Sequence, residues 1–492
     1  MKKISSTRLL LCLAVIRWSF AFITDTAAQT FASLYSFTAE NNGLNSDGAA
    51  PMAGLVLSNS LLYGTASRGG ASGRGAVFRI KTDGNGFTNL HSFGSGSGFF
   101  PNITNSEGAF PEAELVLSGN TLYGTAAFGG DFGQGTVFVV NTAEVTFAVL
   151  HTFTGDDGAA PQGGLILNHN LLYGTTSAGG SFGNGTVFKI NIDDSTFSAL
   201  YDFTALDPSN PDFSANTDGA YPIAGLVLDG NMLYGAADSG GDSGGGTLFA
   251  INSDGTGFLT LHSFTFAGDQ AAPDAPMVLA GGALYGTSHH GASTGFGTVF
   301  KVKTDGNDFE TLHTFSPLDP ATGTNSDGVY PSGGLTLLGN TLYGTASGGG
   351  LSGSGTVFKL NTDGTGFSVL HSFSSRAPNS GTNNDGAFPL GTLVVRGNTL
   401  YGTTSGGGTA GNGTIFSIAL PAAQPQLAIS RVAANVILAW PTNAAGFTLQ
   451  STTNLAPSAI WTPVSSVPAV VNAQNTVTNP IPATRQFFRL AL

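Results

Sequence analysis

Leu62-Tyr63-Gly64-Thr65 is the stretch that decides the fold, because close copies of it occur six more times along the chain. The Tyr-Gly pair returns at intervals of 50 to 61 residues, at Tyr123, Tyr173, Tyr234, Tyr285, Tyr343 and Tyr401. A repeat of this length is typical of architectures in which each copy forms one small unit. The repeat therefore outweighs the several ordinary domains that 492 residues would otherwise suggest.

The sixth copy illustrates the unit. Apolar or alternating stretches separated by Gly-Asn, Gly-rich and Asp-Gly turns predict strands at 335–338, 341–346, 356–360 and 367–373. Asp363-Gly364 is a strong hairpin signal, because both residues tolerate a positive φ. Four short antiparallel strands joined by tight turns form a meander, which is typical of one propeller blade.

The fourth-strand pattern, Phe-x-x-Leu-(His/Tyr)-x-Phe, also occurs seven times, but it is shifted in phase. Its first copy, Phe31–Phe37, precedes the first Tyr-Gly pair, and no copy follows the last pair. We therefore expect Phe31–Phe37 to complete the last blade beside Thr414–Ala419. The sequence predicts an all-β, seven-bladed β-propeller over residues 29–420, closed by its N-terminal strand. A right-handed β-helix is the competing fold, but it would not need this shift.

The first 28 residues read as an export signal. A basic start precedes a mostly apolar run, Leu9–Ile23, and the small residues Thr26-Ala27-Ala28 offer a cleavage site. Arg17 interrupts the apolar run and argues against a membrane anchor. We expect a secreted or cell-surface protein whose mature chain has no integral membrane segment. The single cysteine, Cys12, lies within this segment, so no disulfide is expected after cleavage.

The composition changes at 421–425, a Pro- and Ala-rich linker, and the repeat is absent from 426–492. Four strand-like stretches, at 434–440, 447–450, 460–464 and 487–490, predict a small C-terminal β-sandwich of immunoglobulin or fibronectin type. Two roles remain open for this module, namely surface attachment or sorting, and a passive appendage.

The net charge is −13, although charged residues make up only 10% of the chain. Nucleic acid is a poor partner for such a surface, because its phosphate backbone is also negative. Cations or basic partners remain open, and acidity that serves solubility explains the charge as well. We expect a monomer.

The repeat resembles a known family. The succession Leu-Tyr-Gly-Thr, Gly-Gly-x-x-Gly-x-Gly-Thr-Val-Phe-Lys and Thr-Asp-Gly-x-x-Phe-x-x-Leu-His-Ser-Phe is similar to the Gloeo-Verruco (GloVer) tandem repeat of secreted bacterial proteins. The resemblance spans roughly residues 31–420. It implies an extracellular, propeller-like protein, and it brings no catalytic residues to carry over. Some members of the family end in a sorting tail of an apolar helix and arginines, which this sequence lacks.

An acidic residue precedes the first strand of every unit, two or more residues before a proline. The seven are Asp47, Glu107, Asp157, Asp218, Asp269, Asp327 and Asp385. A ring of carboxylates could hold Ca²⁺, which takes oxygen ligands from loops. An acid that caps its own turn explains the same pattern without a metal. The sequence therefore identifies no metal site, and Ca²⁺ stays an alternative to no cofactor.

Two sets of aromatic residues accompany these loops. Before the proline stand Phe110, Tyr221, Tyr330 and Phe388 where the incoming loop is long, and alanine where it is shorter. These rings could stack on sugars, but their link to loop length favours packing beneath the loops. Five of the fourth strands carry a histidine, and strand alternation predicts that it shares a face with both phenylalanines of its strand.

The sharper functional signal lies at positions that do not repeat. The residues that follow each Tyr-Gly strand differ from unit to unit, although we expect them on one face, called here the upper face. Arg68, Phe128, Asp238, His289 and His290 are candidates to line an asymmetric ligand pocket there. His289 and His290, with Asp238 from the adjacent unit, form the one group that could bind a metal or act as acid and base. Variation that loops merely tolerate is the alternative explanation.

The sequence favours a non-catalytic binding protein over an enzyme, with a glycan or a cell-surface protein as its partner. A polysaccharide hydrolase or lyase that uses the upper-face pocket is the second hypothesis, and a structural envelope protein is the third. No nucleophile elbow, P-loop or zinc-spaced cluster is present in the sequence.

Overall fold

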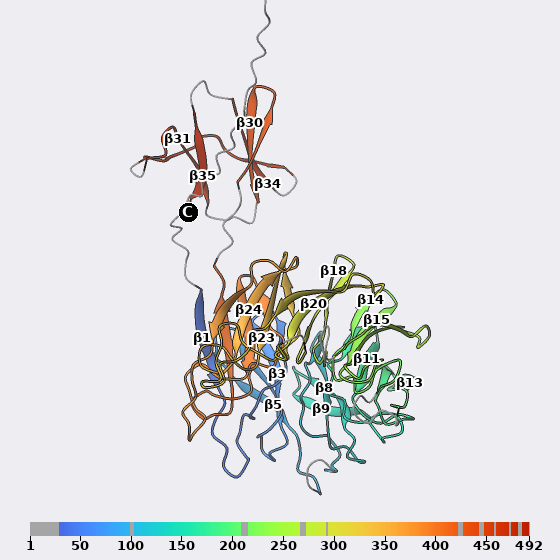
Figure 1. The fold of residues 1–492 in the computed structure, drawn as a ribbon. Coiled ribbons are helices and arrows are strands. Elements are labelled where there is room, and N and C mark those ends of the chain that lie inside the picture. Colours follow the sequence, from blue (N-terminus) through green and yellow to red (C-terminus); the bar gives the residue numbers. More distant parts are fainter. Residues whose placement is uncertain are drawn as a thin grey trace, which may run out of the picture. The chain divides into compact units, whose positions relative to one another are not determined.

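The computed structural model describes residues 29–98, 103–207, 215–265, 272–291, 294–421, 427–441, 447–456, 459–471, 474–480 and 485–491. The expected signal segment, most of the linker at 421–425 and Asp269 lie outside these residues. The chain divides into one compact unit at Gln29–Leu420 and a second that holds Pro421–Leu492. Figure 1 shows strands in both units, and the described residues include no helix that could span a membrane.

The larger unit contains seven four-stranded antiparallel sheets within its described residues. Sheets 1 to 3 comprise β2 (Val56–Ser58), β3 (Leu61–Ala66), β4 (Ala76–Lys81) and β5 (Thr88–Ser92); β6 (Val116–Ser118), β7 (Thr121–Ala126), β8 (Thr136–Asn141) and β9 (Thr146–Thr152); and β10 (Ile166–Asn168), β11 (Leu171–Thr176), β12 (Thr186–Asn191) and β13 (Phe197–Asp202). Sheets 4 to 6 comprise β14 (Val227–Asp229), β15 (Met232–Ala237), β16 (Thr247–Asn252) and β17 (Leu259–Ser263); β18 (Val278–Ala280), β19 (Ala283–Ser288), β20 (Thr298–Lys303) and β21 (Glu310–Thr314); and β22 (Thr336–Leu338), β23 (Thr341–Ala346), β24 (Thr356–Asn361) and β25 (Ser368–Ser372).

Sheet 7 joins the two ends of this unit. It comprises β26 (Val394–Arg396), β27 (Thr399–Thr404), β28 (Thr414–Ala419) and, at its outer edge, β1 (Thr30–Ser36). β1 pairs antiparallel with β28, from Thr30 opposite Ala419 to Ser36 opposite Thr414. The prediction that the N-terminal strand lies beside Thr414–Ala419 is therefore confirmed.

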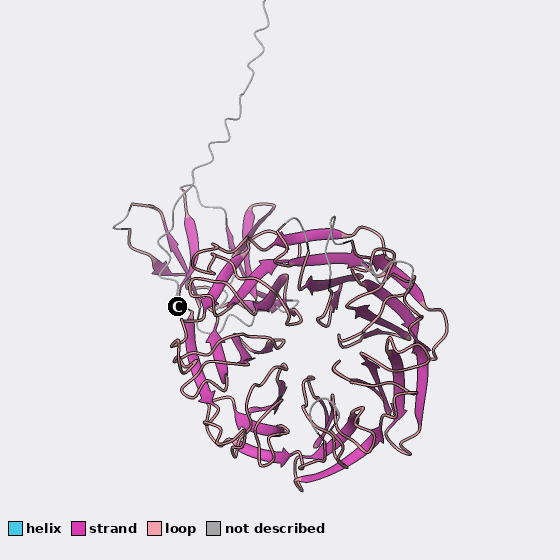
Figure 2. Cartoon of the chain, turned by 60° about the horizontal axis from the view of Figure 1, so that its bottom comes forward, coloured by secondary structure: helices cyan, strands magenta, loops and turns pink. Residues whose placement is uncertain are grey.

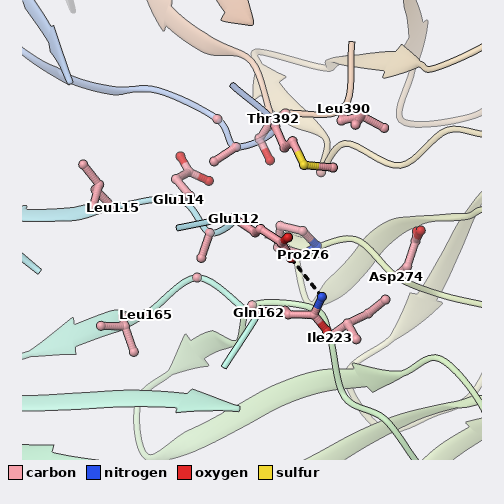
Figure 3. A pocket seen from close by; sticks show the side chains of 18 of the residues that line it. Glu112, Glu114, Leu115, Gln162, Leu165, Ile223, Asp274, Pro276, Leu390 and Thr392 are labelled. Atoms are coloured by element: carbon pink, nitrogen blue, oxygen red, sulfur yellow. Dashed lines mark hydrogen bonds between the residues drawn. The ribbon is translucent and has the colours of Figure 1, made fainter. Parts of the chain in front are cut away.

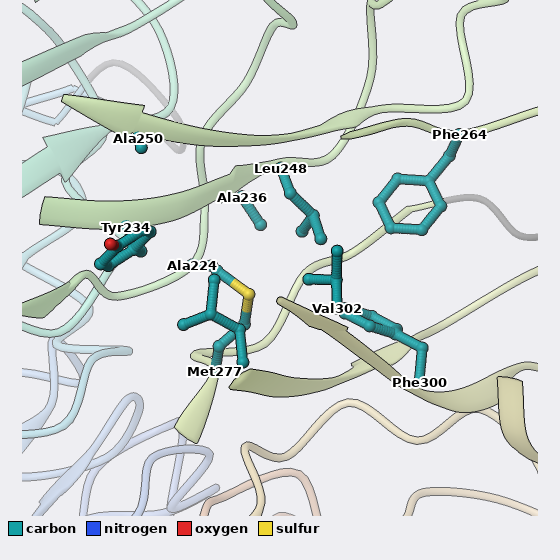
Figure 4. Close-up of a cluster of buried hydrophobic side chains, with 10 residues drawn as sticks. Ala224, Tyr234, Ala236, Leu248, Ala250, Phe264, Met277, Phe300 and Val302 are labelled. Carbon is teal, nitrogen blue, oxygen red and sulfur yellow. The ribbon is translucent and has the colours of Figure 1, made fainter. Parts of the chain in front are cut away.

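The seven sheets surround a common centre in a propeller-like arrangement, seen along its axis in Figure 2. Each neighbouring pair shares one cluster of buried apolar side chains, and this includes sheets 7 and 1. Figure 4 shows the cluster between sheets 4 and 5, in which Leu248 and Phe264 meet Phe300 and Val302. The unit is thus held together by seven cores between sheets rather than by one central core.

The packing explains why Gly64 follows Tyr63. Gly64 lies opposite Phe78 on the neighbouring strand, and the phenyl ring covers its backbone. A Cβ at Gly64 would lie 2.7 Å from the ring of Phe78 and 2.8 Å from Leu55, which is closer than real Cβ contacts. The recurrent Tyr-Gly pair therefore marks the place where an aromatic ring packs directly on the second strand.

Aromatic stacking links the outer strands of neighbouring sheets. The histidine or tyrosine of each fourth-strand pattern stacks on the leading phenylalanine of the next sheet, with centroids 3.6 to 4.1 Å apart. The pairs are Tyr35–Phe87, His91–Phe147, His151–Phe197, Tyr201–Phe258, His262–Phe309, His313–Phe367 and His371–Phe31. The last pair includes Phe31 of β1, so the same contact also closes the ring.

The expectation that this histidine shares a face with both phenylalanines of its strand is wrong. Phe31 contacts His371 and Phe373 of sheet 6, whereas Tyr35 and Phe37 contact Phe87 of sheet 1. The reason is a register shift between Ser33 and Tyr35, which recurs in the outer strand pair of all seven sheets. A β-bulge adds one residue and reverses the alternation beyond it.

The second unit, described by itself, contains two sheets. One comprises β29 (Ala428–Val432), β30 (Asn435–Pro441), β34 (Gln474–Pro480) and β33 (Ala469–Val471), and the other comprises β32 (Thr462–Pro463), β31 (Thr448–Thr452) and β35 (Phe487–Ala491). Leu438, Trp440 and Val477 from the first sheet share a core with Leu449 from the second, and Phe488 and Leu490 pack against it.

Candidate functional site

The residues that follow the seven prolines converge on the centre of the ring. They line a cavity of about 310 Å³ to which every sheet contributes. Two circles of side chains can be distinguished. One position after the proline are Met52, Glu112, Gln162, Ile223, Asp274, Ser332 and Leu390; two positions further on are Gly54, Glu114, Gly164, Gly225, Pro276, Gly334 and Thr392. The residues differ from sheet to sheet although their positions are equivalent, and Figure 3 labels Glu112, Gln162, Ile223, Asp274 and Leu390 of the first circle.

A left-handed backbone turn aims these residues at the centre. The residue before each proline has a φ of 52° to 59°, in sheets with Phe110, Tyr330 or Phe388 as well as in sheets with alanine. At Tyr330, the amide donates to Phe296 O in the preceding sheet, and the carbonyl accepts from Ser347 N. Such a conformation costs on the order of 1 kcal/mol or more for a residue with a side chain. Hydrogen bonds on both sides of the residue offset that cost.

The threonine of Leu-Tyr-Gly-Thr fixes the same segments from the side. Thr65 Oγ1 donates to Ala113 O of sheet 2, and Thr403 Oγ1 donates to Ala53 O of sheet 1 at 2.8 Å. Small residues then let neighbouring segments touch, because a Cβ at Gly391 would lie 2.5 Å from the backbone of Ala53. Hydrogen bonds and close backbone contacts therefore hold together the segments that form the cavity wall.

A hydrogen-bonded network crosses sheets 2 and 3. Ser177 Oγ donates to Gln162 Oε1 at 2.8 Å, and Gln162 Nε2 donates to Glu112 Oε2 at 3.0 Å, the bond drawn in Figure 3. Burial raises the pKa of Glu112, while the hydrogen bond from Gln162 and the charge of Arg68 oppose that rise. Glu112 and Met52 also line a second cavity of about 300 Å³, shared with Ser67, Arg68 and Phe110. Glu112 thus stands between the two cavities.

Glu114, unlike Glu112, has no hydrogen-bond partner among the residues that the structure describes. Its carboxyl group lies where Gly54 leaves room, since a Cβ at Gly54 would be 3.2 Å from Glu114 Oε1. Part of the side chain is accessible to the cavity, but the surrounding segments enclose it, and burial alone raises its pKa to about 7. Glu114 is therefore only partly ionised near neutral pH.

A second polar group spans sheets 5 and 6. His289 Nδ1 lies 3.0 Å from Asp274 Oδ2 and 3.0 Å from Ser332 Oγ, while Ser332 Oγ donates to Tyr330 O at 3.2 Å. The consistent assignment has Nδ1–H donate to Asp274. Burial raises the pKa of Asp274, and the contact with His289 opposes this rise. The buried atom Asp274 Oδ1 has no hydrogen-bond partner among the described residues.

This arrangement is not a Ser-His-Asp relay. A relay needs the carboxylate on one imidazole nitrogen and the hydroxyl on the other, so that a proton can pass through the ring. Asp274 and Ser332 share the same nitrogen of His289. In addition, no group of three or more potential ligand side chains is placed to hold a metal ion within the described ranges.

The five residues singled out from the sequence follow the second strands of their sheets, and none of them is among the described residues that line the central cavity. The loops that carry them pair with the loops between sheets, as in the antiparallel bridges of Arg68 with Ala49 and of Phe128 with Ala109. Arg68 lines the second cavity, and Phe128 meets Phe110 edge to face, with centroids 6.1 Å apart. Arg68 and Phe128 thus both lie near Phe110, which precedes the first strand of sheet 2.

His289, His290 and Asp238 are only partly brought together. The two imidazole rings lie 4.4 Å apart, and both contact the ring of Tyr330. Burial lowers the pKa of His290, and the charge of His289 lowers it further. Asp238 accepts a hydrogen bond from Ser239 Oγ instead, and the carboxylate that contacts His289 is Asp274.

The two circles at the centre were not singled out by the sequence analysis. Their signal was present, because the positions one and three residues after a repeated proline vary from Met52 to Glu112 and from Gly54 to Glu114. That variation becomes a functional signal only when the inner end of each sheet is known to face the axis.

The acids between the sheets are occupied by internal hydrogen bonds. Asp327 accepts from His313 Nε2 at 3.3 Å, from Ser316 N at 3.0 Å and from the Ser316 hydroxyl. The same pattern ties Tyr35 and Thr38 to Asp47. Related contacts hold Glu107, Asp157, Asp218 and Asp385. These carboxylates therefore cap the loops that lead into the next sheet.

The aromatic residues before the prolines have mixed surroundings. The Arg376 guanidinium, in the long loop before sheet 7, lies 4.2 Å from the ring centroid of Phe388. This contact matches packing beneath a long loop. Tyr221, in contrast, keeps 38% of its surface exposed.

Comparison with known proteins identifies the repeat. The Gloeobacter/Verrucomicrobia repeat matches residues 18–215, 212–381 and 320–433. No curated protein matches the chain. Among solved structures, an oligogalacturonate lyase in complex with manganese is 11% identical, with 74% of this chain and 86% of that chain covered and a TM-score of 0.43. The oligogalacturonate lyase of Vibrio parahaemolyticus is 10% identical, with 81% and 98% covered and a TM-score of 0.44. A nidogen/laminin complex is 15% identical, with 55% and 82% covered and a TM-score of 0.34.

Proposed function

The chain belongs to the Gloeobacter/Verrucomicrobia repeat family, and we propose that it is a non-catalytic, carbohydrate-binding β-propeller. In this proposal the seven sheets are the seven blades of a closed propeller, and residues 426–492 form an immunoglobulin-like sandwich. The carbohydrate occupies the central cavity and the upper face around it.

One observation supports this most strongly, namely the asymmetry of the circle that follows the prolines. Its polar pairs, Glu112 with Gln162 and Asp274 with Ser332, are separated by Ile223 on one side and by Leu390 with Met52 on the other. A sugar ring has hydroxyl groups around its edge and apolar C–H faces, so it matches alternating polar and apolar walls. A volume of about 310 Å³ lies at the small end of ligand pockets and suits one sugar residue.

Binding without turnover is favoured because the polar side chains of the cavity form hydrogen bonds with one another. Ser177 donates to Gln162 and Gln162 donates to Glu112, while His289 contacts Asp274 and Ser332 through a single nitrogen. The basic start and apolar run of residues 1–28 support export by a cleaved signal. N-terminal sequencing of the exported protein would then begin near Gln29.

A glycan array tests the proposal, together with Gln162→Leu and the matched control Gln134→Leu. Gln162→Leu removes the amide that reaches Glu112, and we expect it to weaken glycan binding at least tenfold. Gln134 does not belong to the described lining of either cavity, so its variant should bind as the wild type does. Release of reducing ends or of unsaturated sugars would assign a hydrolase or a lyase instead. A complete lack of glycan binding would overturn the proposal and favour a structural envelope role.

A further inference from the structure

Three carboxyl groups line the central cavity, and one of them retains a buried oxygen that has no hydrogen-bond partner among the described residues. Glu112, Glu114 and Asp274 line it together. Asp274 Oδ1 is buried and has no hydrogen-bond partner among the described residues. The Glu114 carboxyl group lies beside Gly54 at the cavity wall, and none of the described residues donates a hydrogen bond to it. Unsatisfied buried acceptors in a native structure call for a missing donor.

The positively charged or proton-donating side chains near the cavity, Arg68 and His289, already interact with Glu112 and Asp274. The charge of Arg68 acts on Glu112 from the second cavity, and His289 Nδ1 contacts the other oxygen of Asp274. The charge of Asp238 adds to the negative potential at Asp274. The pKa of His290, which lies beside His289, is lowered by burial first and by the charge of His289 second. The cavity therefore has acceptors and negative charge in excess of its donors.

From this imbalance we infer that the ligand carries a protonated amino group, and that the cavity binds an amino sugar with a free amine. The inference rests on the proposed carbohydrate-binding function. An ammonium group has three N–H donors and no acceptor, which complements carboxyl oxygens that lack donors. The positive charge of the ammonium group also compensates a carboxylate, whose burial in an enclosed site without a counter-charge costs free energy.

The apolar side chains between the polar pairs of the cavity indicate what the rest of the ligand is. Met52, Ile223 and Leu390 present no hydrogen-bonding side-chain groups, so they suit the C–H faces of a pyranose ring. An acetylated amine would lose the charge, and a uronic acid would add a carboxylate to a cavity that already holds three carboxyl groups. The geometry therefore selects against N-acetylated and acidic sugars.

Titration calorimetry with glucosamine, glucose and N-acetylglucosamine tests the inference at pH 7 in the presence of a chelator. Glucosamine should bind at least tenfold more tightly than the other two sugars. Glu114→Gln keeps the shape but removes the negative charge, and it should reduce this preference severalfold or more. Glu144→Gln is the matched control, because Glu144 is exposed in the turn after β8 and its preference should equal that of the wild type.

Three outcomes would contradict the inference in different ways. Equal affinity for glucose and glucosamine would refute the amine while leaving carbohydrate binding intact. Equal affinity for Nα-acetyl-lysine amide, whose ε-amino group is free, would show that the cavity binds an amine without requiring a sugar. No binding of any monosaccharide, together with a blank glycan array, would overturn the proposed function itself.

Discussion

At the scale of single residues, Glu114 links the cavity to the stability of the fold. Its pKa rises from an ordinary value of 4.5 to about 7, because the carboxyl group is buried without a partner. The folded protein therefore binds this proton more tightly than the unfolded chain does. The stability associated with the proton is complete below about pH 4.5 and is lost as the pH rises through 7.

We accordingly expect Glu114→Gln to be more stable than the wild type at pH 8, by at most roughly 3 kcal/mol, and nearly equal to it at pH 4.5. Thermal unfolding at the two pH values measures the difference. Glu144→Gln removes the same charge at an exposed site and should show no such pH dependence. A stabilisation of equal size at both pH values would mean that the carboxyl group is not desolvated.

At the scale of elements, the outer strands combine a bulge, a ring stack and a capped acid. His313 stacks on Phe367 of the next sheet at 3.6 Å and contacts Asp327. Burial alone would raise the pKa of Asp327, but the hydrogen bonds from His313 and Ser316 hold it below its ordinary value. This contribution to stability is present above about pH 4 and is lost as the pH falls through the lowered pKa.

His313→Ala should destabilise the protein by about 2 kcal/mol, because it removes the stack and leaves Asp327 with one partner fewer. His313→Tyr should cost much less, since Tyr35 and Tyr201 make the same stack and the same bond to Asp47 and Asp218. Urea unfolding of both variants measures the difference. Equal losses would mean that the position requires histidine for another reason.

At the scale of the larger unit, closure depends on β1. Removal of residues 30–36 would expose the edge of β28 and eliminate the Phe31–His371 and Tyr35–Phe87 stacks. We expect a lower and less cooperative thermal transition, together with self-association through the unpaired edge. Circular dichroism and size-exclusion chromatography measure both effects.

A rearranged chain provides the control for closure. When residues 30–36 are moved behind Leu420 through a copy of the turn 361–366, sheet 7 is built from one continuous stretch, as the other six are. This chain should unfold close to the wild-type temperature. If deletion of β1 left unfolding unchanged, the pairing with β28 would contribute nothing to the ring.

The strands, the turns and the strand that closes the ring could be predicted from the repeat alone. Each of these follows from a local pattern, such as Tyr63-Gly64 or Asp363-Gly364, and the patterns could be recognised because the repeat occurs seven times. The side on which a bulged strand places its rings was not predictable, because the residue at the bulge is a leucine, such as Leu34, which is equally common in a regular strand.

Only the tertiary structure decided which side chains form the candidate site. Met52, Glu112, Gln162, Ile223 and Asp274 are about 50 to 60 residues apart in sequence and meet only because the ring brings every inner segment to one axis. Position relative to that axis, rather than residue type, separates Glu114 from the capping Glu107. The physical reason is that a local pattern fixes the path of the backbone, whereas burial and partners depend on what the other six sheets place nearby.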